Sequence, residues 1–439
     1  MIGLTAGEIA QLTDGSSQAE GAVTGIATDS RAVRPGDLFV ALAGERADGA
    51  RFAIDALSAG AAAALVPRGH EGPGRIAVDD PLAALGAIAR ELRLRSRAAV
   101  VGITGSTGKT STKDILAALV EPHRRLVASR QNENNELGVP LTLARLEPDT
   151  EVAVVEMAMR GLGQIAYLAD IARPGIGIVT GIGPVHLELL GTLERVAAAK
   201  AELLAALPAD GVAIVPHGEP QLRPHLDGLA CRVVTFGSDR AADVRLHTFT
   251  ARGDRGRAEI ELHGRTLRVP VNFTAPHNAV NLTAAAAAYD ALGLPLDGLA
   301  AGAQAVAFSR WRGEQLELAE GGLLIADCYN ANPTSMRAAL EHLAAVAGRR
   351  RRVAVLGDMA ELGAGAPAYH AELGELLREQ GVEQVVAIGP LSRAYGGRWF
   401  ATVEQAREQL TDLIRPGDAV LVKASRSMGL EAIVEAIAP

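Results

Sequence analysis

Short apolar runs alternate with longer amphipathic segments from residue 98 onward, and this alternation predicts buried strands joined by helices. Continuous apolar strands separated by helices are typical of a parallel sheet that is covered on both faces. Eight runs predict such strands, at residues 99–103, 152–156, 176–180, 212–215, 323–326, 353–356, 385–388 and 419–422. The predicted fold class is therefore α/β.

Other stretches carry different patterns, and the length of 439 residues suits about three domains. The expected elements are a strand at 37–42, helices at 52–63, 82–94 and 279–292, and antiparallel strands within 244–271 with turns at 253–256 and 263–264. The shifts in pattern place the expected domains at residues 1–96, 97–313 and 314–439.

The first strand of the middle domain opens into Gly105-Ser106-Thr107-Gly108-Lys109-Thr110-Ser111. A strand that ends in a glycine-rich turn before a helix presents several backbone N–H groups and the positive end of the helix dipole to one point. Lys109 adds a positive charge, and the Thr110 hydroxyl can ligate Mg²⁺. The usual first glycine of such loops would fall on Ile103, so a tight turn with an incidental lysine is the alternative. The order of strand, turn, Lys-Thr and helix favours a site for the phosphates of a nucleoside triphosphate.

Three further polar residues are candidates for metal binding, each with a plainer alternative. Glu156 ends the strand at 152–156, which suits an acidic Mg²⁺ ligand facing the loop, with a solvated carboxylate as the alternative. His186 follows the strand at 176–180, where it suits a metal ligand or a polar contact, although alone it resembles a surface histidine. Lys200 lies on an expected helix and is by default solvated. In apolar surroundings its pKa would fall, and the free amine could react with CO₂ to form an anionic, metal-binding carbamate.

Two asparagine-rich segments are candidates for ligand contacts. Asn132, Asn134 and Asn135 fill a dense polar loop that ends in Gly-Val-Pro. Asn278 and Asn281 stand three positions apart at the start of a helix, so both could face one ligand. The alternative for Asn278 is that it simply caps that helix.

The boundary between the second and third domains carries Arg310 and Arg312 on either side of Trp311. An arginine at a hinge could stabilise the charge on a transferring phosphoryl group, and an interdomain salt bridge is the alternative. Asp327 ends a strand of the third domain, where its carboxylate could accept hydrogen bonds from ribose hydroxyls.

Composition narrows the function classes. Hydrophobic residues make up 48% of the chain and aromatic residues 3%, so the cores must be built from Ala, Leu, Val and Ile. A net charge of -8 with dispersed Lys and Arg argues against nucleic acid as a partner. Cys231 and Cys328 suggest neither a disulfide framework nor a cysteine zinc site. With no leader-like start and no stretch long enough to span a bilayer, we expect a cytoplasmic monomer that has small-molecule partners and no membrane association.

Together these segments resemble the Mur ligase family over essentially the whole chain. The motifs that carry the resemblance lie at residues 28–31, 35–44, 105–110, 132–140, 156–157, 183–186, 199–202, 277–281, 327–333, 356–363 and 422–426. The strings Tyr-Asn-Ala-Asn-Pro at 329–333 and Gly-Asp-Met-Ala-Glu-Leu-Gly at 357–363 are the most specific. They resemble the family member that adds D-alanyl-D-alanine to UDP-N-acetylmuramoyl-tripeptide. The Asp-Asn-Pro-Arg motif of the sister ligase that adds the third amino acid is absent.

The resemblance implies an N-terminal UDP-sugar-binding domain, a central P-loop sheet for ATP and a Rossmann-like C-terminal domain. It implies that Lys109 holds the β- and γ-phosphates, and that Thr110 and Glu156 ligate one Mg²⁺. It implies that His186 and a carbamylated Lys200 serve a second Mg²⁺. The implied nucleotide contacts are Gly105, Ser106, Thr107, Gly108 and Ser111 for phosphates, Asn278 and Asn281 for adenine, Arg312 for the γ-phosphate and Asp327 for ribose. The implied substrate contacts are Ser30, Arg31, Asn132, Asn134, Asn135, Tyr329, Asn330, Asn332, Lys423, Ser425 and Arg426.

The implied reaction uses ATP to phosphorylate the terminal carboxylate of the tripeptide. The amino group of D-alanyl-D-alanine then attacks the acyl phosphate, which gives the amide, ADP and phosphate. One alternative is a sister ligase that adds a single amino acid to a UDP-muramoyl peptide, or glutamate to folate. Another is a P-loop switch or motor that acts through a protein partner. A non-catalytic binding module is the weakest alternative, because every expected metal and phosphate position is filled.

Three positions depart from the family's pattern. Glu133 replaces an apolar or aromatic residue in the asparagine loop, Ala424 replaces a glycine, and Gly313 replaces a methionine. The change at residue 424 matters only if that backbone needs a positive φ. None of the three removes an implied ligand.

Overall fold

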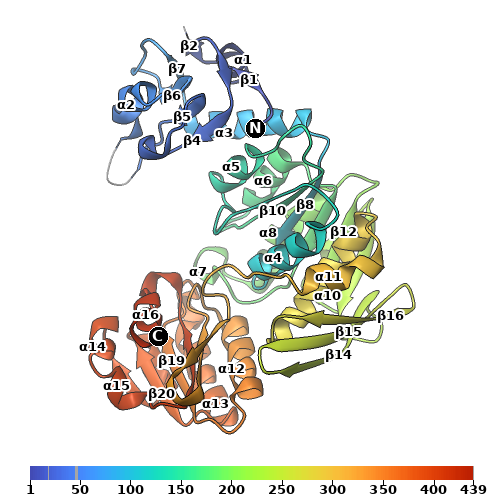
Figure 1. Ribbon diagram of the computed structural model, residues 1–439, viewed down its shortest axis with the longest axis vertical. Coiled ribbons are helices and arrows are strands. Elements are labelled where there is room, and N and C mark those ends of the chain that lie inside the picture. The colour runs from blue at the N-terminus through green and yellow to red at the C-terminus, as the bar shows by residue number, and fades with distance from the viewer. Residues whose placement is uncertain (18, 45–47, 439) are drawn as a thin grey trace.

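The computed structural model describes residues 1–17, 19–44 and 48–438, whose strands form three main sheets in chain order (Figure 1). We call the parts built on these sheets the first, central and C-terminal units. In Figure 1 the first unit lies at the top, the central unit below it and the C-terminal unit at the lower left. All three units combine strands with helices, so the predicted α/β fold class is confirmed.

The first unit holds a five-stranded sheet in the order β2-β7-β6-β5-β4, parallel except for the edge strand β2, and a small β1-β3 pair. Its strands are β1 (Leu4–Thr5), β2 (Ser16–Ser17), β3 (Ala22–Val23), β4 (Gly25–Ala27), β5 (Asp37–Val40), β6 (Ala63–Pro67) and β7 (Arg75–Val78). Its helices are α1 (Ala6–Leu12), α2 (Ala53–Ser58) and α3 (Pro81–Arg95).

The helix expected at 52–63 is shorter than predicted. The α2 helix ends at Ser58, where the Gly60 N–H donates to Leu57 O at 3.1 Å and the Ala61 N–H donates to Ala56 O at 3.0 Å. Such bonds close a helix C-terminus and turn the chain. The alanines at 61–64, which fit a helix by composition, instead lead into β6.

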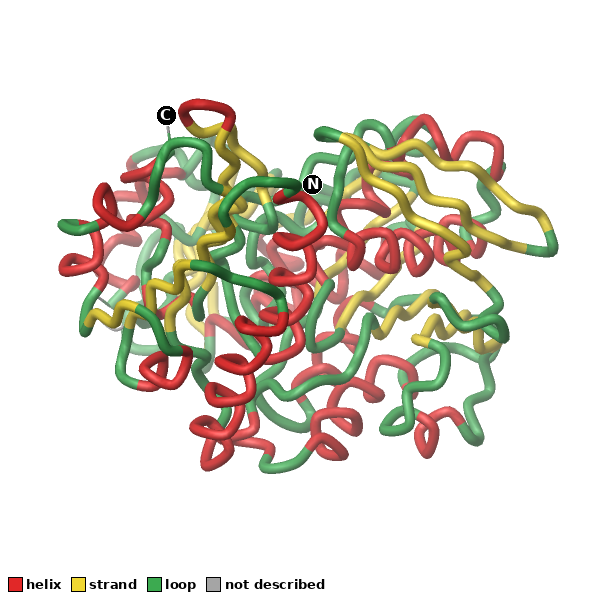
Figure 2. The backbone as a smooth tube through the Cα atoms, turned by 90° about the horizontal axis from the view of Figure 1, so that it is seen from below, coloured by secondary structure: helices red, strands yellow, loops and turns green. Residues whose placement is uncertain are grey.

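The central unit is built on one nine-stranded sheet in the order β16-β15-β14-β13-β12-β11-β8-β10-β9. Its strands are β8 (Ala99–Thr104), β9 (Leu126–Ala128), β10 (Val152–Glu156), β11 (Ile176–Val179), β12 (Val212–Pro216), β13 (Arg232–Gly237), β14 (Val244–Arg252), β15 (Arg255–Leu262) and β16 (Arg265–Val271). The strands from β9 to β14 run parallel, and β14, β15 and β16 are antiparallel. The predicted antiparallel segment is confirmed. Figure 2 shows its long strands side by side at one edge of the molecule.

Helices cover both faces of the central sheet. They are α4 (Lys109–Val120), α5 (Gly138–Leu143), α6 (Gln164–Ala172), α7 (Leu187–Leu190), α8 (Leu193–Ala205), α9 (Arg223–Leu226), α10 (Pro276–Ala291) and α11 (Leu299–Ala303). One face packs α4, α10 and α11 in a core that includes five consecutive alanines of α10, from Ala284 to Ala288. The other face packs α5, α6 and α8, together with α3 of the first unit.

The first unit is joined to the central unit through α3. Asp80 caps this helix and Pro81 occupies its first turn, which fixes where it begins. A side chain at Gly86 would place its Cβ 2.6 Å from the hydroxyl of Tyr167 on α6, so the two helices meet closely at this glycine. The first unit is thus held by a shared hydrophobic core and not by a linker alone.

The C-terminal unit has a six-stranded sheet in the order β17-β18-β22-β19-β20-β21, parallel except for β17. Its strands are β17 (Glu314–Leu318), β18 (Gly322–Ala326), β19 (Arg352–Gly357), β20 (Gln384–Ile388), β21 (Arg398–Phe400) and β22 (Ala419–Lys423). Its helices are α12 (Pro333–Ala347), α13 (Ala366–Glu379), α14 (Val403–Arg407), α15 (Leu410–Leu413) and α16 (Glu431–Ile437). Among the described residues, no helix of any unit combines the length and apolarity needed to cross a membrane.

Candidate active site

The glycine-rich loop lies between β8 and α4, as its sequence predicts. Lys109 is the first residue of α4, and its Nζ donates to the Gly105 carbonyl oxygen at 2.8 Å. Burial lowers the pKa of Lys109, the nearby Glu156 carboxylate opposes this shift, and Arg312 adds to it. The lysine therefore curls over its own loop, with Thr110 and Ser111 following in the first turn of the helix.

Gly105 and Gly108 of the loop leave no room for a side chain, because neighbouring side chains lie too close to them. Gly108 has a φ of 77°, and a Cβ there would lie 2.6 Å from Asn281 Oδ1. A Cβ at Gly105 would lie 1.9 Å from Thr180 Oγ1. Since the Thr180 hydroxyl also donates to the Thr107 carbonyl oxygen, Thr180 holds the loop from β11. The sequence analysis missed Thr180 as a site residue, and its place at the carboxyl end of an expected strand was the available signal.

Glu156 is buried at the end of β10 and has one unpaired oxygen. Its side chain is 1% exposed, so the solvated alternative is wrong. Oε1 accepts from Asn134 Nδ2 at 2.8 Å, whereas Oε2 is buried with no hydrogen-bond partner among the described residues. A buried carboxylate oxygen without a partner is costly, and a hard cation is a suitable partner for it.

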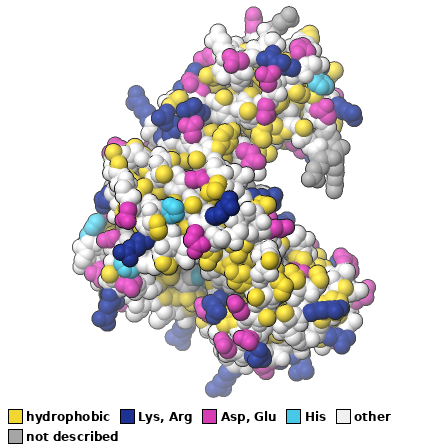
Figure 3. Space-filling model, turned by 180° about the vertical axis from the view of Figure 1, so that it is seen from behind, with side chains coloured by type: hydrophobic (Ala, Val, Ile, Leu, Met, Phe, Trp, Pro, Cys, Tyr) yellow, Lys and Arg dark blue, Asp and Glu magenta, His cyan; other side chains and the backbone are white. Residues whose placement is uncertain are grey.

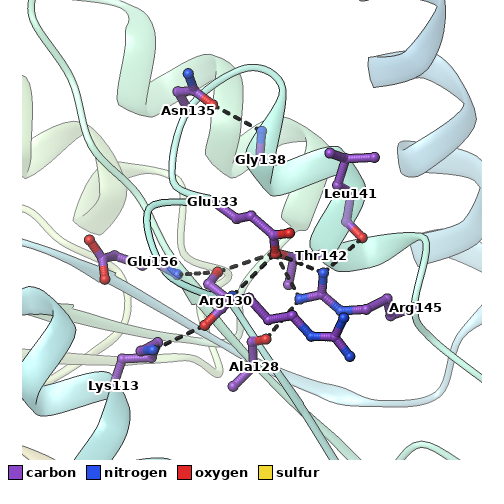
Figure 4. A network of polar contacts seen from close by, with 11 residues as sticks. Lys113, Ala128, Arg130, Glu133, Asn135, Gly138, Leu141, Thr142, Arg145 and Glu156 are labelled. Atoms are coloured by element: carbon purple, nitrogen blue, oxygen red, sulfur yellow. Dashed lines mark hydrogen bonds and ion pairs between the residues drawn. The ribbon is translucent and has the colours of Figure 1, made fainter. Parts of the chain in front are cut away.

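The asparagine loop is held by a network around Glu133 (Figure 4). Glu133 Oε2 lies 2.7 Å from Arg145 Nη1, and it also accepts from the Arg130 N–H at 3.2 Å and the Thr142 hydroxyl at 3.4 Å. Arg145 donates in turn to the Ala128 carbonyl oxygen at 2.8 Å. The residue that departs from the family's pattern is therefore the anchor of this loop.

The three asparagines of that loop differ in their environments. Asn134 contacts Glu156, as described above. Asn135 Oδ1 accepts from the N–H groups of Leu137 and Gly138, so it stabilises the start of α5. Asn132 is exposed, and its carbonyl oxygen accepts from the Asn134 N–H at 2.8 Å. Among the three, Asn134 is the one that is hydrogen-bonded to a predicted site residue outside this loop, within the described part of the chain.

His186 lies at the seam between the central and C-terminal units, immediately before α7. Its Nδ1 is hydrogen-bonded to Glu361 Oε2, a residue of the C-terminal unit. Burial lowers the pKa of His186, Glu361 opposes the shift, and the positive charge of Lys200 adds to it. The sequence analysis missed Glu361 as a partner, although it lies in one of the most specific motifs.

Lys200 is buried on α8, so the solvated alternative is wrong. Its side chain is 2% exposed, and no hydrogen bond or ion pair joins it to another described residue. Burial lowers the pKa of Lys200 well below its usual value, and the charge of Lys109 adds to this shift. The burial of Lys200 therefore favours the free amine, which is the form that the sequence analysis requires for a reaction with CO₂.

Asn278 and Asn281 lie on one face of α10, beside the glycine-rich loop. Asn281 Nδ2 donates to Asn278 Oδ1 at 3.1 Å, and both side chains are buried. The helix begins at Pro276 with Ala275 as its cap, so the alternative that Asn278 caps it is wrong. The neighbouring His277 is partly buried, and its Nδ1, which is shielded from solvent, has no partner among the described residues.

Arg312 reaches from the segment before β17 to the glycine-rich loop. Its Nη2 donates to Thr110 Oγ1 at 3.2 Å, and its guanidinium carbon lies 3.9 Å from the centroid of the Tyr329 ring. It makes no ion pair with a described residue, so the salt-bridge alternative is wrong. Arg426 lies 5.6 Å from the centroid of the same ring. The two arginines and Tyr329 form one basic and aromatic group.

Asp327 and Lys423 form a partly buried ion pair at the ends of β18 and β22, in which Lys423 is 2% and Asp327 18% exposed. Lys423 Nζ lies 2.8 Å from Asp327 Oδ2 and also donates to the Asn330 carbonyl oxygen at 2.8 Å. Ser425 Oγ accepts from the Ala360 N–H at 2.8 Å. These predicted nucleotide and substrate residues therefore brace one another and the 327–333 and 357–363 loops.

Asn332 has a double role in the structure. Its Oδ1 caps α12 by accepting from the Ser335 N–H, and its Nδ2 donates to the Ser106 carbonyl oxygen at 3.5 Å. Ser106 is itself bonded to Gly183 through its hydroxyl. The C-terminal unit thus touches the glycine-rich loop directly.

Ser30 and Arg31 lie apart from all these residues, in the first unit. They form a short 3₁₀ turn after β4, and the exposed Arg31 pairs with Asp29 at 2.7 Å. Hydrogen bonding to Arg31 lowers the pKa of Asp29 to about 2. Figure 3 shows a notch in the molecular surface between the first and C-terminal units, and β4 lies at the side of the first unit that faces the other units in Figure 1.

Comparison with family models covers most of the chain. The Mur ligase family catalytic domain matches residues 22–102, the Mur ligase middle domain matches 103–289, and the Mur ligase glutamate ligase domain matches 311–426.

Individual relatives match over nearly their full length. The UDP-N-acetylmuramoyl-tripeptide–D-alanyl-D-alanine ligase of Synechocystis sp. is 37% identical over 94% of this chain and 91% of its own. The enzyme of that name from Escherichia coli is 36% identical over 100% of this chain and 99% of its own.

Two solved structures are similar to this chain over nearly its full length. A crystal structure of MurF from Acinetobacter baumannii has a TM-score of 0.90 and 30% identity, covering 99% of this chain and 98% of that one. MurF ligase from Thermotoga maritima, in complex with ADP, has a TM-score of 0.85 and 29% identity, covering 94% of this chain and 97% of that one.

Proposed function

The chain belongs to the Mur ligase family, and we infer that it carries out the ligation that its relatives' names state. It joins D-alanyl-D-alanine to UDP-N-acetylmuramoyl-tripeptide in peptidoglycan synthesis and uses ATP. The observation that carries this function is that the boundary segment before β17 and the C-terminal unit both contact the glycine-rich loop. Arg312 reaches Thr110, and Asn332 reaches the backbone of Ser106. A ligase needs its second substrate close to the transferring phosphoryl group, and this docking supplies that proximity.

Two groups of residues fit Mg²⁺. The unpaired Oε2 of Glu156 and the hydroxyl of Thr110 are oxygen donors beside the glycine-rich loop, which suits one ion. His186 and Lys200 would hold a second ion if Lys200 is carbamylated, since the buried free amine fits that modification. When bound, Mg²⁺ would screen the negative charges that the γ-phosphate and the substrate carboxylate bring together.

The protein's own residues complete the phosphoryl transfer. Lys109 and the N–H groups at the start of α4 hold the phosphates. Arg312 lies beside Thr110 and stabilises the charge on the transferring group. Asn278 and Asn281 hold the base, and Asp327 holds the ribose through the carboxylate that Lys423 orients. Ser30 and Arg31 hold the UDP group in the first unit.

The second step joins the dipeptide to the acyl phosphate. Its amino group attacks the acyl carbon, the phosphate leaves, and the amine loses a proton to give the amide. We assign the C-terminal loops with Tyr329, Asn330, Asn332, Ser425 and Arg426 to the dipeptide and the acyl end of the tripeptide. The docked units would keep water from the acyl phosphate. Asn132, Asn134 and Asn135 would contact the tripeptide from the central unit.

The remaining assignments follow from the substrates. All of them are small molecules, and ATP and UDP-sugars are cytoplasmic, so we place the enzyme in the cytoplasm. We place the domain boundaries near residues 96 and 313, where the sheets change.

The test is phosphate release from ATP and Mg²⁺ with UDP-N-acetylmuramoyl-tripeptide, with and without D-alanyl-D-alanine. We expect release that requires both substrates, and a product heavier by the dipeptide residue. Release with a single amino acid in place of the dipeptide would move the chain to a sister activity. Release that needs a protein partner, and no small amine, would favour the P-loop switch instead.

A further inference from the structure

The seam between α7 and the loop after β19 holds a contact that the proposed reaction leaves unexplained. Glu361 projects from the C-terminal unit to the imidazole of His186 in the central unit. The backbones meet at the same point, because the Glu188 N–H donates to the Glu361 carbonyl oxygen at 3.2 Å. A Cβ at Gly363 would lie 3.2 Å from Glu188 Cα, so this glycine permits the close approach. In Figure 1, α7 lies between the two units.

Both partners adopt an uncommon backbone conformation. His186 has a φ of 53° and Glu361 a φ of 62°, and neither is glycine. Non-glycine residues in this region are held by their surroundings and cluster at functional sites. The coincidence of two such residues in one side-chain contact indicates that the contact has a role beyond packing.

The chemistry of imidazole suggests what that role is. A carboxylate on Nδ1 accepts the Nδ1 proton and leaves the lone pair on Nε2. His186 Nε2 makes no hydrogen bond to any described residue, and the side chain is 23% exposed. Histidines that bind metals commonly donate their other N–H to a carboxylate, which fixes the tautomer and the ring orientation.

We propose that Glu361 is a positioning residue, which holds His186 through Nδ1 so that Nε2 can ligate the second metal ion. Because Glu361 comes from the C-terminal unit, that metal site is complete only when the C-terminal unit is docked. Arg160, at 3.7 Å from Glu361 Oε1, balances the carboxylate on its other side. The inference rests on the proposed role of His186 as a ligand.

The test measures metal binding and not only turnover. Mn²⁺ is titrated into the full chain with a non-hydrolysable ATP analogue and UDP-N-acetylmuramoyl-tripeptide, and bound ions are counted by electron paramagnetic resonance. Pulsed measurements detect the coupling of an imidazole nitrogen to Mn²⁺. The variants are Glu361→Ala, Glu361→Gln and His186→Ala. Glu372→Gln, an exposed glutamate on α13, is the matched control.

We expect wild type and Glu372→Gln to bind two ions, one of them with imidazole coupling. Glu361→Ala should weaken the second ion by about 10- to 100-fold and leave the first unchanged. The affinity of Glu361→Gln for the second ion should lie between those of wild type and Glu361→Ala, since its amide oxygen can still accept a hydrogen bond from the Nδ1–H group. In a His186→Ala background, Glu361→Ala should cause no further loss of affinity for the second ion. A merely structural role for Glu361 would not predict this result.

Two results would overturn the inference, and they differ in whether the proposed metal assignment of His186 fails as well. If Glu361→Ala and Glu361→Gln bind both ions as wild type does, Glu361 does not position the ligand, and the proposed function stands. If wild type shows no imidazole coupling and His186→Ala retains both ions, His186 is not a ligand. In that case the proposed metal assignment fails together with the inference.

Discussion

The Glu133–Arg145 pair offers the sharpest test of how the asparagine loop is held. Its two side chains are 26% and 23% exposed, so the pair lies between an exposed and a buried one. Exposed pairs contribute about 0–1 kcal/mol, and breaking a buried pair costs about 3–5 kcal/mol. Glu133 also accepts from the Arg130 N–H and the Thr142 hydroxyl. We therefore expect a coupling free energy of about 1–2 kcal/mol between Glu133 and Arg145.

Loss of the Glu133–Arg145 pair should also weaken binding at the proposed nucleotide site. Glu133 precedes Asn134, whose amide holds Glu156 at 2.8 Å. Loosening the loop should therefore weaken the binding of ADP with Mg²⁺ by at most about tenfold, because 1.4 kcal/mol corresponds to a factor of ten. The KM for D-alanyl-D-alanine should change less, since the dipeptide is assigned to the C-terminal loops.

The assay is a double-mutant cycle on wild type, Glu133→Ala, Arg145→Ala and the double variant. Denaturant unfolding gives the free energies of unfolding, and calorimetric titration gives ADP affinity in the presence of Mg²⁺. Glu136→Gln, an exposed glutamate of the same loop, is the control and should leave both unchanged. A coupling below about 0.5 kcal/mol, within the range of additive sites, would refute the reasoning.

Two further predictions concern the nucleotide loop and the seam between the units. Gly108→Ala places a Cβ 2.6 Å from Asn281 Oδ1 at a φ of 77°, so ADP affinity in a calorimetric titration should fall by about tenfold or more, and unchanged affinity would contradict the geometry. His342 of α12 lies at that seam, where its Nε2 is hydrogen-bonded to the Thr274 hydroxyl of the central unit at 2.9 Å. Burial lowers the pKa of His342 to about 3, so the unfolded chain binds a proton below about pH 6.5 that the folded chain does not. Stability should therefore fall as the pH drops from 6.5 towards 3, by up to about 1.4 kcal/mol per pH unit from this group. Equal slopes of the unfolding midpoint against pH for wild type and His342→Gln would be evidence against it.

The sequence predicts most of the sheets because their strands are continuous apolar runs. The runs at 152–156 and 353–356 are buried strands, as expected. The helix predicted at 52–63 was too long because alanine suits both a helix and a buried strand, although Gly60, where the chain turns out of the helix, was a local stop signal. The extension of the central sheet by β14 to β16 was beyond reach, since sheet membership depends on distant pairing.

The sequence predicts which residues belong to the candidate site, but it reveals less about their burial and their partners. The glycine-rich loop follows from local order alone, and the structure places Lys109 and Thr110 accordingly. The burial of Lys200 depends on packing around α8, which its helical sequence does not reveal. The partner of His186 lies 175 positions away in the chain, so only the folded arrangement of the units brings Glu361 to it.

The alanine-rich packing of α10 has a consequence for how the nucleotide preference can change. The asparagines that we assign to the base and the glycine-rich loop that we assign to the phosphates lie at the starts of α10 and α4, two helices that share one core. The small alanine side chains set the distance between the two helices, because a larger side chain at these positions would push the helices apart. Tolerance of a different base can therefore arise at core positions that never touch a nucleotide, such as Ala285 or Ala286, and not only in the site itself.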